Sequence, residues 1–193
     1  EGEVSLTTVV SLLPFLEAPL ATLKKSHPAL HVSLHLGDDG PSVREREVDL
    51  ALAIMKRPPQ GCWGRKLLKL RSGVFATREA LARDPQQWVV RAQAEQYSPE
   101  STWEREHART IAARAPFFAM VPLAAQGLGL TLMPRLLASK HPQLQEVPEY
   151  TKLMEPLDRT LWLLTHPDHR KVPRIDAVMD VLIEAFTEAA KSA

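Results

Sequence analysis

Several features are scarce in this sequence of 193 residues. Its single cysteine, Cys62, excludes an internal disulfide framework and agrees with a reducing compartment. Apolar stretches are interrupted well before about 18 residues, the length that indicates a membrane span, and no signal peptide is visible. Neither sign of charge predominates, since 24 Lys and Arg stand against 23 Asp and Glu. The chain therefore lacks the basic excess of a protein that binds nucleic acid strongly by itself.

Motifs typical of catalysis and metal binding are also missing. No G-x-S-x-G nucleophile turn occurs. His166 and His169 in "HPDH" have no Cys or convergent carboxylate nearby in sequence, which favours a solvated turn over a metal site. Asp38 and Asp39 in "GDDGP" are typical of a turn rather than of paired acid and base. The sequence thus predicts no metal and no cofactor, and an enzyme is the least favoured class because no nucleophile and base are assembled.

What the sequence does contain is an alternation of strand and helix patterns. The first part predicts a strand at 3–6, a helix within 7–28, a half-buried strand at 29–37, a short polar helix at 41–47 and a buried strand at 48–54. Pro14 and Pro19 should make the first helix start late or kink, and the alternation in 29–37 should bury Leu30, Val32, Leu34 and Leu36. This order predicts an α/β architecture with mostly parallel pairing.

The second part of the chain predicts a further α/β group. Residues 67–77 are long for one strand and can cross between two lobes. After residue 77 the pattern predicts a helix at 78–84, a strand at 87–92 and an ill-defined stretch at 93–108. It then predicts a strand at 109–113, a helix at 116–126, a strand at 129–133 and a helix at 134–140. The chain then returns to a strand at 159–165 and a last helix, whose apolar stripe comprises Ile175, Val178, Met179, Leu182 and Phe186. We therefore expect one lobe from 1–71 with 160–193 and another from 72–159.

The segment "AAQGLGLTLMPRLLA" at 124–138 raises the question of a phosphate-binding loop. A dinucleotide loop leads from a strand into a helix, whereas here a helix pattern precedes Gly127 and a strand pattern follows Gly129. We therefore expect Gly127 at a helix C′ position with positive φ. At the other end of the chain, Thr7 and Thr8 can either cap the first helix or present hydroxyls to a ligand at the carboxyl edge of the sheet.

The order of these motifs resembles the effector-binding domain of LysR-type transcriptional regulators, over residues 3–187. The segments that carry the resemblance are "EVSLTTVVSLLPFLEAPLATLKKSHPALHVSL", "REREVDLALAI", "GVFATREALA", "FFAMVPLAAQGLGLTLMPRLLA" and "LWLLTHPDHRKVPRIDAVMDVLIEAF". The resemblance implies two Rossmann-like subdomains of the type 2 periplasmic-binding-protein kind, joined by two crossover strands. It implies a small effector in the cleft between them and a homodimer or homotetramer in the bacterial cytoplasm. DNA would be bound only through the family's N-terminal winged helix-turn-helix, which precedes this sequence, and no membrane is implied.

The resemblance also implies effector contacts at particular positions. They match Thr7, Thr8, Val10, Asp38, Asp39, Ile54, Ser72, Ala115 and Pro116. Many members carry an arginine just after "DLAL", where this chain has Ile54 and Met55, and a polar cap where it has Ala115 and Pro116. These departures favour an apolar or aromatic effector over a dicarboxylate. A solute-binding receptor of the same fold is the alternative, and the missing export signal disfavours it.

Overall fold

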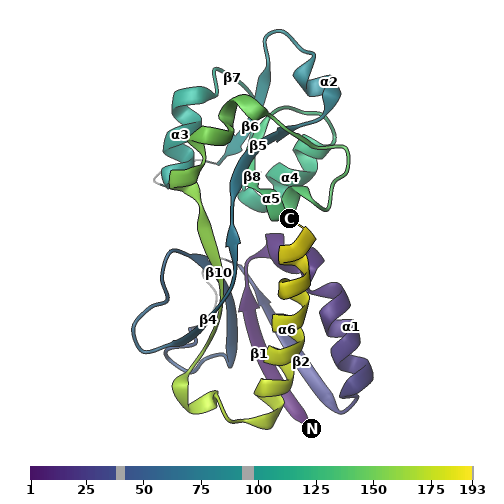
Figure 1. The fold of residues 1–193 in the computed structure, drawn as a ribbon, viewed down its shortest axis with the longest axis vertical. Helices are drawn as coiled ribbons and strands as arrows, with labels where there is room; N and C mark the ends of the chain where they lie inside the picture. The colour runs from purple at the N-terminus through teal and green to yellow at the C-terminus, as the bar shows by residue number, and fades with distance from the viewer. Residues whose placement is uncertain (38–41, 93–97, 193) are drawn as a thin grey trace. The chain divides into compact units, whose positions relative to one another are not determined.

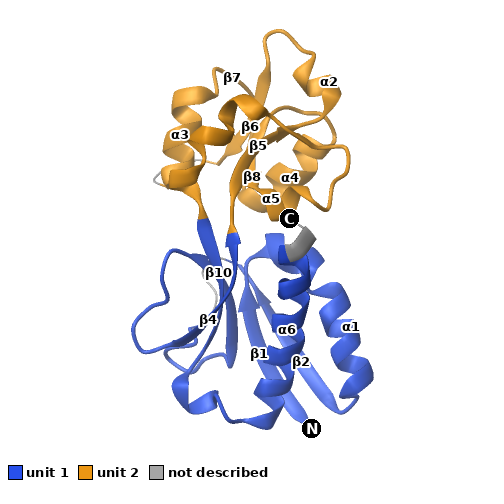
Figure 2. Cartoon of the chain, in the orientation of Figure 1, with its two compact units in different colours: residues 1–69, 159–193 blue, residues 70–158 orange. Residues whose placement is uncertain are grey.

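The computed structural model describes residues 1–37, 42–92 and 98–192. The chain divides into two compact units, which are coloured separately in Figure 2. Unit 1 comprises Glu1–Lys69 and Arg159–Ala193, and unit 2 comprises Leu70–Asp158. The chain therefore leaves unit 1 once and returns to it once.

Unit 1 is built on a five-stranded sheet with the order β2-β1-β3-β10-β4 (Figure 1). The strands are β1 (Gly2–Thr8), β2 (Leu30–Leu36), β3 (Leu50–Met55), β4 (Trp63–Leu70) and β10 (Arg159–Thr165). β1 is parallel to both β2 and β3, whereas β10 is antiparallel to β3. The apolar run predicted at 48–54 is confirmed as a central strand, buried between two neighbours.

Helices α1 (Glu17–Ser26) and α6 (Pro173–Ser192) lie against each other in unit 1. The chain first forms a 3₁₀ helix, η1 (Val10–Phe15), with Pro14 inside it, and α1 begins only afterwards. This confirms the late start that the prolines predicted, because a proline lacks the N–H that an α-helix interior needs. The predicted stripe of α6 is confirmed as well, since all five of its residues are buried.

Unit 2 contains two small sheets that share a backbone bridge. One has the order β8-β5-β9, formed by β5 (Ser72–Ala76), β8 (Thr131–Pro134) and β9 (Gln145–Glu146). The other pairs β6 (Gln87–Arg91) in parallel with β7 (Thr110–Ala115). Trp88 and Leu130 form a parallel bridge between them, so β6, β7 and β8 run in the same direction.

Short helices and 3₁₀ segments in the described part of unit 2 cover these strands. They are α2 (Arg78–Leu81), α3 (Pro99–His107), α4 (Phe117–Ala125), α5 (Arg135–Ala138), η3 (Pro148–Leu153) and η4 (Glu155–Leu157). The core beneath them is aromatic, since Trp88, Trp103 and Tyr150 pack with ring centroids 5.5–6.1 Å apart. Such tilted and edge-on contacts fit the charge distribution of aromatic rings. They fix α3 and η3 on β6.

The glycines after α4 occupy a helix end. Gly127 has φ +77°, and its N–H and that of Leu128 donate to the carbonyls of Ala124 and Leu123. This Schellman pattern confirms the predicted C′ position. A Cβ on Gly129 would lie 2.5 Å from the Gln87 carbonyl oxygen, so glycine is needed there for close approach to β6. Neither glycine precedes a helix N-terminus, and the phosphate-loop interpretation is excluded.

Several local expectations are wrong in detail. Thr7 and Thr8 belong to β1 and cap no helix, since Val9 and Leu16 occupy the N-cap positions and make no side-chain cap. The described part of the predicted polar helix, 42–47, forms turns, in which Arg46 has φ +61°. Leu36 is 43% exposed because β2 is an edge strand. Residues 67–77 form two strands rather than one, and antiparallel pairs are as prominent as parallel ones.

Candidate functional site

The carboxyl ends of β1 and β3 bring four of the expected contact residues to one edge of unit 1. Thr8 is 3% exposed, and its Oγ1 donates to the Leu52 carbonyl 3.1 Å away on β3. Ile54 lies two residues further along the same strand, and Val10 begins η1. Because β1 and β3 are parallel, these residues lie at the edge where α/β sheets bind ligands.

Ser11 is a polar residue at this edge that the sequence analysis missed. Its Oγ is buried and makes no hydrogen bond within the described residues. A buried hydroxyl without a partner costs free energy, so it is a group that a ligand can satisfy. Its position beside Val10, in a stretch interpreted only as helix, gave no separate signal. Thr7, also on β1, is buried as well.

The remaining described contact residues lie at one edge of unit 2. Ser72 starts β5 opposite Pro134, the last residue of β8, and Ala115 ends β7 opposite Arg91, the last residue of β6. Since β6, β7 and β8 run the same way, both positions belong to the carboxyl edge of those strands. Pro116 follows as the N-cap of α4 and supplies no side-chain cap.

Both hydrogen-bond donors of Ser72 are engaged within unit 2. Its N–H donates to Asp158 Oδ1 at 3.1 Å, and its Oγ donates to the Leu157 carbonyl at 3.2 Å. These bonds join the start of β5 to the segment that leads back to unit 1. The hydroxyls of Thr8 and Ser72 are thus already used as donors, and only their lone pairs are open to a ligand. Asp38 and Asp39 lie outside the described residues.

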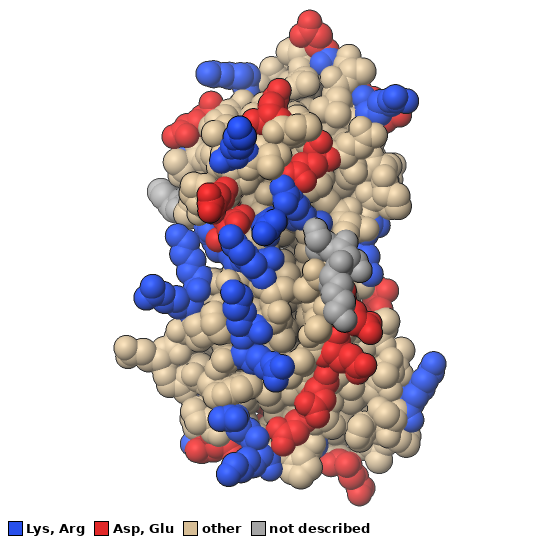
Figure 3. Space-filling view, viewed as in Figure 1, with Lys and Arg blue, Asp and Glu red and all other residues tan. Residues whose placement is uncertain are grey.

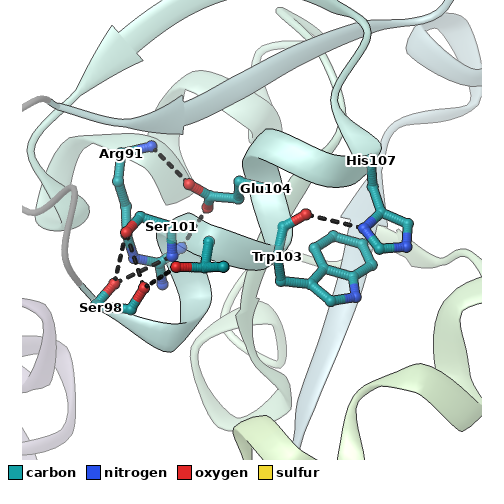
Figure 4. Close-up of polar contacts among 7 residues, drawn as sticks. Arg91, Ser98, Ser101, Trp103, Glu104 and His107 are labelled. Carbon is teal, nitrogen blue, oxygen red and sulfur yellow. Dashed lines mark hydrogen bonds and ion pairs between the residues drawn. The ribbon is translucent and has the colours of Figure 1, made fainter.

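A buried ion pair stands at the same edge of unit 2 and was not predicted. The guanidinium of Arg91 contacts the Glu104 carboxylate, whose other oxygen accepts the Arg91 N–H at 3.1 Å (Figure 4). The side chains are only 8% and 4% exposed, and the Arg91 guanidinium lies 4.9 Å from the Phe117 ring centroid. Glu104 is presented by α3, which Ser98 caps by accepting the Ser101 N–H. The sequence carries the start signal Ser-Pro-Glu for α3, but no apolar stripe follows it.

The histidines and the cysteine do not assemble a reactive centre. His166 Nδ1 lies 3.5 Å from Asp168, whereas His169 Nδ1 lies 3.6 Å from Asp49, so the two rings face different carboxylates. Within 1–37, 42–92 and 98–192, no group of three or more His, Cys, Asp or Glu could hold a metal ion. Burial raises the pKa of the Cys62 thiol, and nearby Arg44 only partly opposes this. A raised pKa lowers the thiolate fraction and with it the nucleophilicity of Cys62.

The even charge balance of the sequence conceals separated charges on unit 1. Figure 3 shows Lys and Arg side chains gathered over β4 and β10, with Asp and Glu over the helices of the same unit. Residues 56–71 contain six basic and no acidic residues, and Arg65, Lys66 and Lys69 are exposed on β4. Because β4 is an edge strand, these charges oppose pairing with the edge of another sheet.

The comparison with protein families decides the identity of this fold. The family model described as the LysR substrate binding domain matches residues 1–187. The chain belongs to this family. The predicted α/β fold of the periplasmic-binding-protein kind is therefore confirmed, together with the resemblance on which it was based.

The solved structures similar to this LysR domain are transcriptional regulators or domains of them. The CrgA regulatory domain of Neisseria meningitidis has a TM-score of 0.74 at 20% identity, with 95% of this chain and 98% of that chain covered. The AmpR effector domain of Pseudomonas aeruginosa has a TM-score of 0.72 at 16% identity, and 98% of each chain is covered. Full-length AphB of Vibrio cholerae has a TM-score of 0.69 at 15% identity, covering 95% of this chain and 68% of that chain.

No curated protein sequence matches this LysR domain. At identities of 15–20%, the structural neighbours establish the fold and leave the ligand to be argued from the site. None of the helices in the described part of the chain has the length and apolar composition that a membrane span requires.

Proposed function

We propose that this LysR domain senses a small effector and transmits its binding to the DNA-binding part of a transcriptional regulator. The observation that carries the proposal is the family match over residues 1–187, which spans both units. Effector binding is coupled to DNA binding by the difference in affinity that the effector has for the two states of the regulator. The units 1–71 with 160–193 and 72–159 act in this proposal as the two regulatory subdomains, and the chain itself performs no catalysis.

The effector contacts comprise Thr7, Thr8, Val10 and Ile54 of unit 1 with Ser72, Ala115 and Pro116 of unit 2, and we add Ser11. Val10, Ile54, Ala115 and Pro116 have pure hydrocarbon side chains, which favours an apolar or aromatic effector. The hydroxyls of Thr8 and Ser72 donate to main-chain carbonyls, so they can only accept from an effector. The best match is therefore a neutral aromatic molecule that carries an N–H or O–H donor.

The regulator acts in this proposal as a homodimer or homotetramer in the bacterial cytoplasm. DNA is bound by an N-terminal winged helix-turn-helix outside the present sequence. The balanced charge of this domain, with 24 basic and 23 acidic residues, supports that division of labour.

A thermal-shift screen tests the effector class. Phenol, indole and benzamide represent neutral aromatic donors, and succinate represents dicarboxylates. A ligand at 100 times its Kd stabilises by about 2.7 kcal/mol, which is a shift of about 5–10 °C for a chain of this size. We expect shifts with the neutral aromatics, and shifts with succinate alone would contradict the proposed effector class.

Two substitutions of Thr8 locate the ligand. Thr8→Val removes the hydroxyl that bonds to the Leu52 carbonyl, and Thr8→Ser keeps it. Because Thr8→Val also lowers the starting Tm, the quantity to compare is the shift that the ligand causes in each variant. We expect the shift to fall in Thr8→Val and to persist in Thr8→Ser. Equal shifts in both variants would place the ligand elsewhere.

A further inference from the structure

Three cations gather at the β4 edge of the unit 1 sheet. Arg65 and Lys66 are exposed on β4, and Arg57 is exposed on the connection that precedes this strand. The connection folds back on β4, since a Cβ on Gly64 would lie 2.9 Å from Pro58 Cγ, and Arg57 and Arg65 are the chain neighbours of these two residues. In the described part of the chain, Arg57, Arg65 and Lys66 form no ion pair. We call these three residues the basic strip.

Three carboxylates follow one face of α6 in the same unit. Asp176, Asp180 and Glu184 are four residues apart, so each lies about one helical turn from the next and the row is about 12 Å long. Asp180 and Glu184 are exposed, and Asp176 is partly exposed. None of the three is paired with a cation among the described residues. Like charges at this spacing repel each other, and cations from outside the helix would relieve that repulsion. We call these residues the acidic row.

The basic strip and the acidic row do not meet within one chain. α6 lies against α1 and β1, whereas β4 is the third strand from β1 in the order β2-β1-β3-β10-β4 (Figure 1). Neighbouring strands are about 4.8 Å apart, so β4 lies about 14 Å from β1 across the sheet. Figure 3 shows the same separation, with Lys and Arg over β4 and with Asp and Glu over the helices of unit 1. Each surface is therefore open to a partner outside its own chain.

We propose that the acidic row of one copy of this domain docks on the basic strip of a second copy. The domain as a whole is nearly neutral, with 24 basic and 23 acidic residues, yet unit 1 carries the two signs on separate surfaces. Each copy therefore offers both halves of an electrostatically complementary contact. The charges that oppose a second strand at the β4 edge attract a helix of opposite charge. Because the two surfaces differ, the contact is heterologous and can join copies beyond a dimer.

Salt dependence is the first test of this contact. Exposed ion pairs are individually weak and are screened by salt. Sedimentation equilibrium of the whole domain should show self-association in about 20 mM NaCl that weakens at least about tenfold in about 500 mM NaCl. An interface held by apolar burial would not weaken in this way.

A charge swap identifies the two surfaces. Arg65→Glu with Lys66→Glu makes the basic strip acidic, and Asp180→Lys with Glu184→Lys makes the acidic row basic. Within either variant the strip and the row then carry the same sign, so each variant alone should self-associate about tenfold or more weakly than the native domain. A one-to-one mixture of the two variants brings opposite signs together again and should recover the association. All four side chains are exposed, so both variants should fold.

A matched control separates the contact from the change in net charge. Arg109→Glu with Lys152→Glu changes the net charge by the same amount as Arg65→Glu with Lys66→Glu, but both of its side chains are exposed on unit 2. This variant should self-associate like the native domain.

Four results would overturn the proposal. The first is the absence of salt-sensitive self-association up to about 1 mM domain. The second is equal weakening in the strip variant and in its unit 2 control, and the third is a mixture that associates no better than the separate swap variants. The fourth is binding of a DNA duplex by the basic strip without self-association, which would assign the strip to nucleic acid. None of the substituted residues is an effector contact, so each of these results would leave the effector proposal standing.

Discussion

Replacing Arg91 by methionine tests how the edge of unit 2 is stabilised. The substitution keeps much of the side-chain volume but leaves the Glu104 carboxylate, 4% exposed, without its guanidinium partner. Breaking a buried ion pair in this way costs about 3–5 kcal/mol, because an uncompensated charge remains in a poorly solvated place. For a chain of 193 residues we therefore expect Tm to fall by about 6–20 °C.

The double variant Arg91→Met with Glu104→Leu separates charge burial from packing. It removes both charges, so most of the lost stability should return. A residual cost of about 1–3 kcal/mol should remain, because the Arg91 main-chain N–H donates to Glu104 and loses that acceptor. Arg109→Met, exposed on the connection between α3 and β7, is the control and should change stability by less than about 0.5 kcal/mol.

Urea denaturation followed by tryptophan fluorescence provides the readout, since Trp88 and Trp103 both lie in the core of unit 2. The reasoning would be refuted if Arg91→Met cost no more than the Arg109→Met control. It would equally fail if the double variant were as unstable as Arg91→Met, because the loss would then come from packing rather than from charge.

Three further predictions concern single groups. Burial raises the pKa of Tyr150 to about 12, so ionisation of its hydroxyl opposes folding. The free energy of unfolding should therefore fall as the pH rises from about 10 towards 12. Tyr150→Phe should remove this loss, together with the tyrosinate absorbance that develops at the high-pH end of a titration. Cys62 should react with iodoacetamide more slowly than a free thiol at pH 8, and Arg44→Gln should slow it further, because Arg44 lowers the pKa of the Cys62 thiol. Gly129→Ala should destabilise unit 2 by about 1–3 kcal/mol in urea, since its Cβ would meet the Gln87 carbonyl.

Elements with strong local patterns were predictable from the sequence. The stripe of α6, the apolar run of β3 and the helix end at Gly127 each depend on residues that are neighbours in the chain or one helical turn apart. The helix α3 was missed because only its start signal is local. Its apolar contribution is concentrated in Trp103, whose partners Trp88 and Tyr150 lie far away in the sequence.

The candidate site was harder to predict from the sequence, because its contacts also join residues far apart in the chain. The alternation in 30–36 predicts which residues share a face, but not that β2 lies at an edge and leaves Leu36 exposed. The hydrogen bond from Thr8 to Leu52 spans 44 positions, so local patterns suggested a cap instead. The pairing of Arg91 with Glu104 spans 13 positions and is set by how α3 folds back on β6.

The order in which the units occur along the chain has a consequence for synthesis. Unit 2 is uninterrupted from Leu70 to Asp158, and the bonds of Ser72 to Leu157 and Asp158 close its two ends. Unit 1 is split, because β10 lies between β3 and β4 and is made about a hundred residues after them. On the ribosome, β1, β2, β3 and β4 are therefore synthesised first and remain an incomplete sheet while unit 2 is synthesised. Only when Arg159–Thr165 emerges can β4 gain its neighbour and the outer unit close.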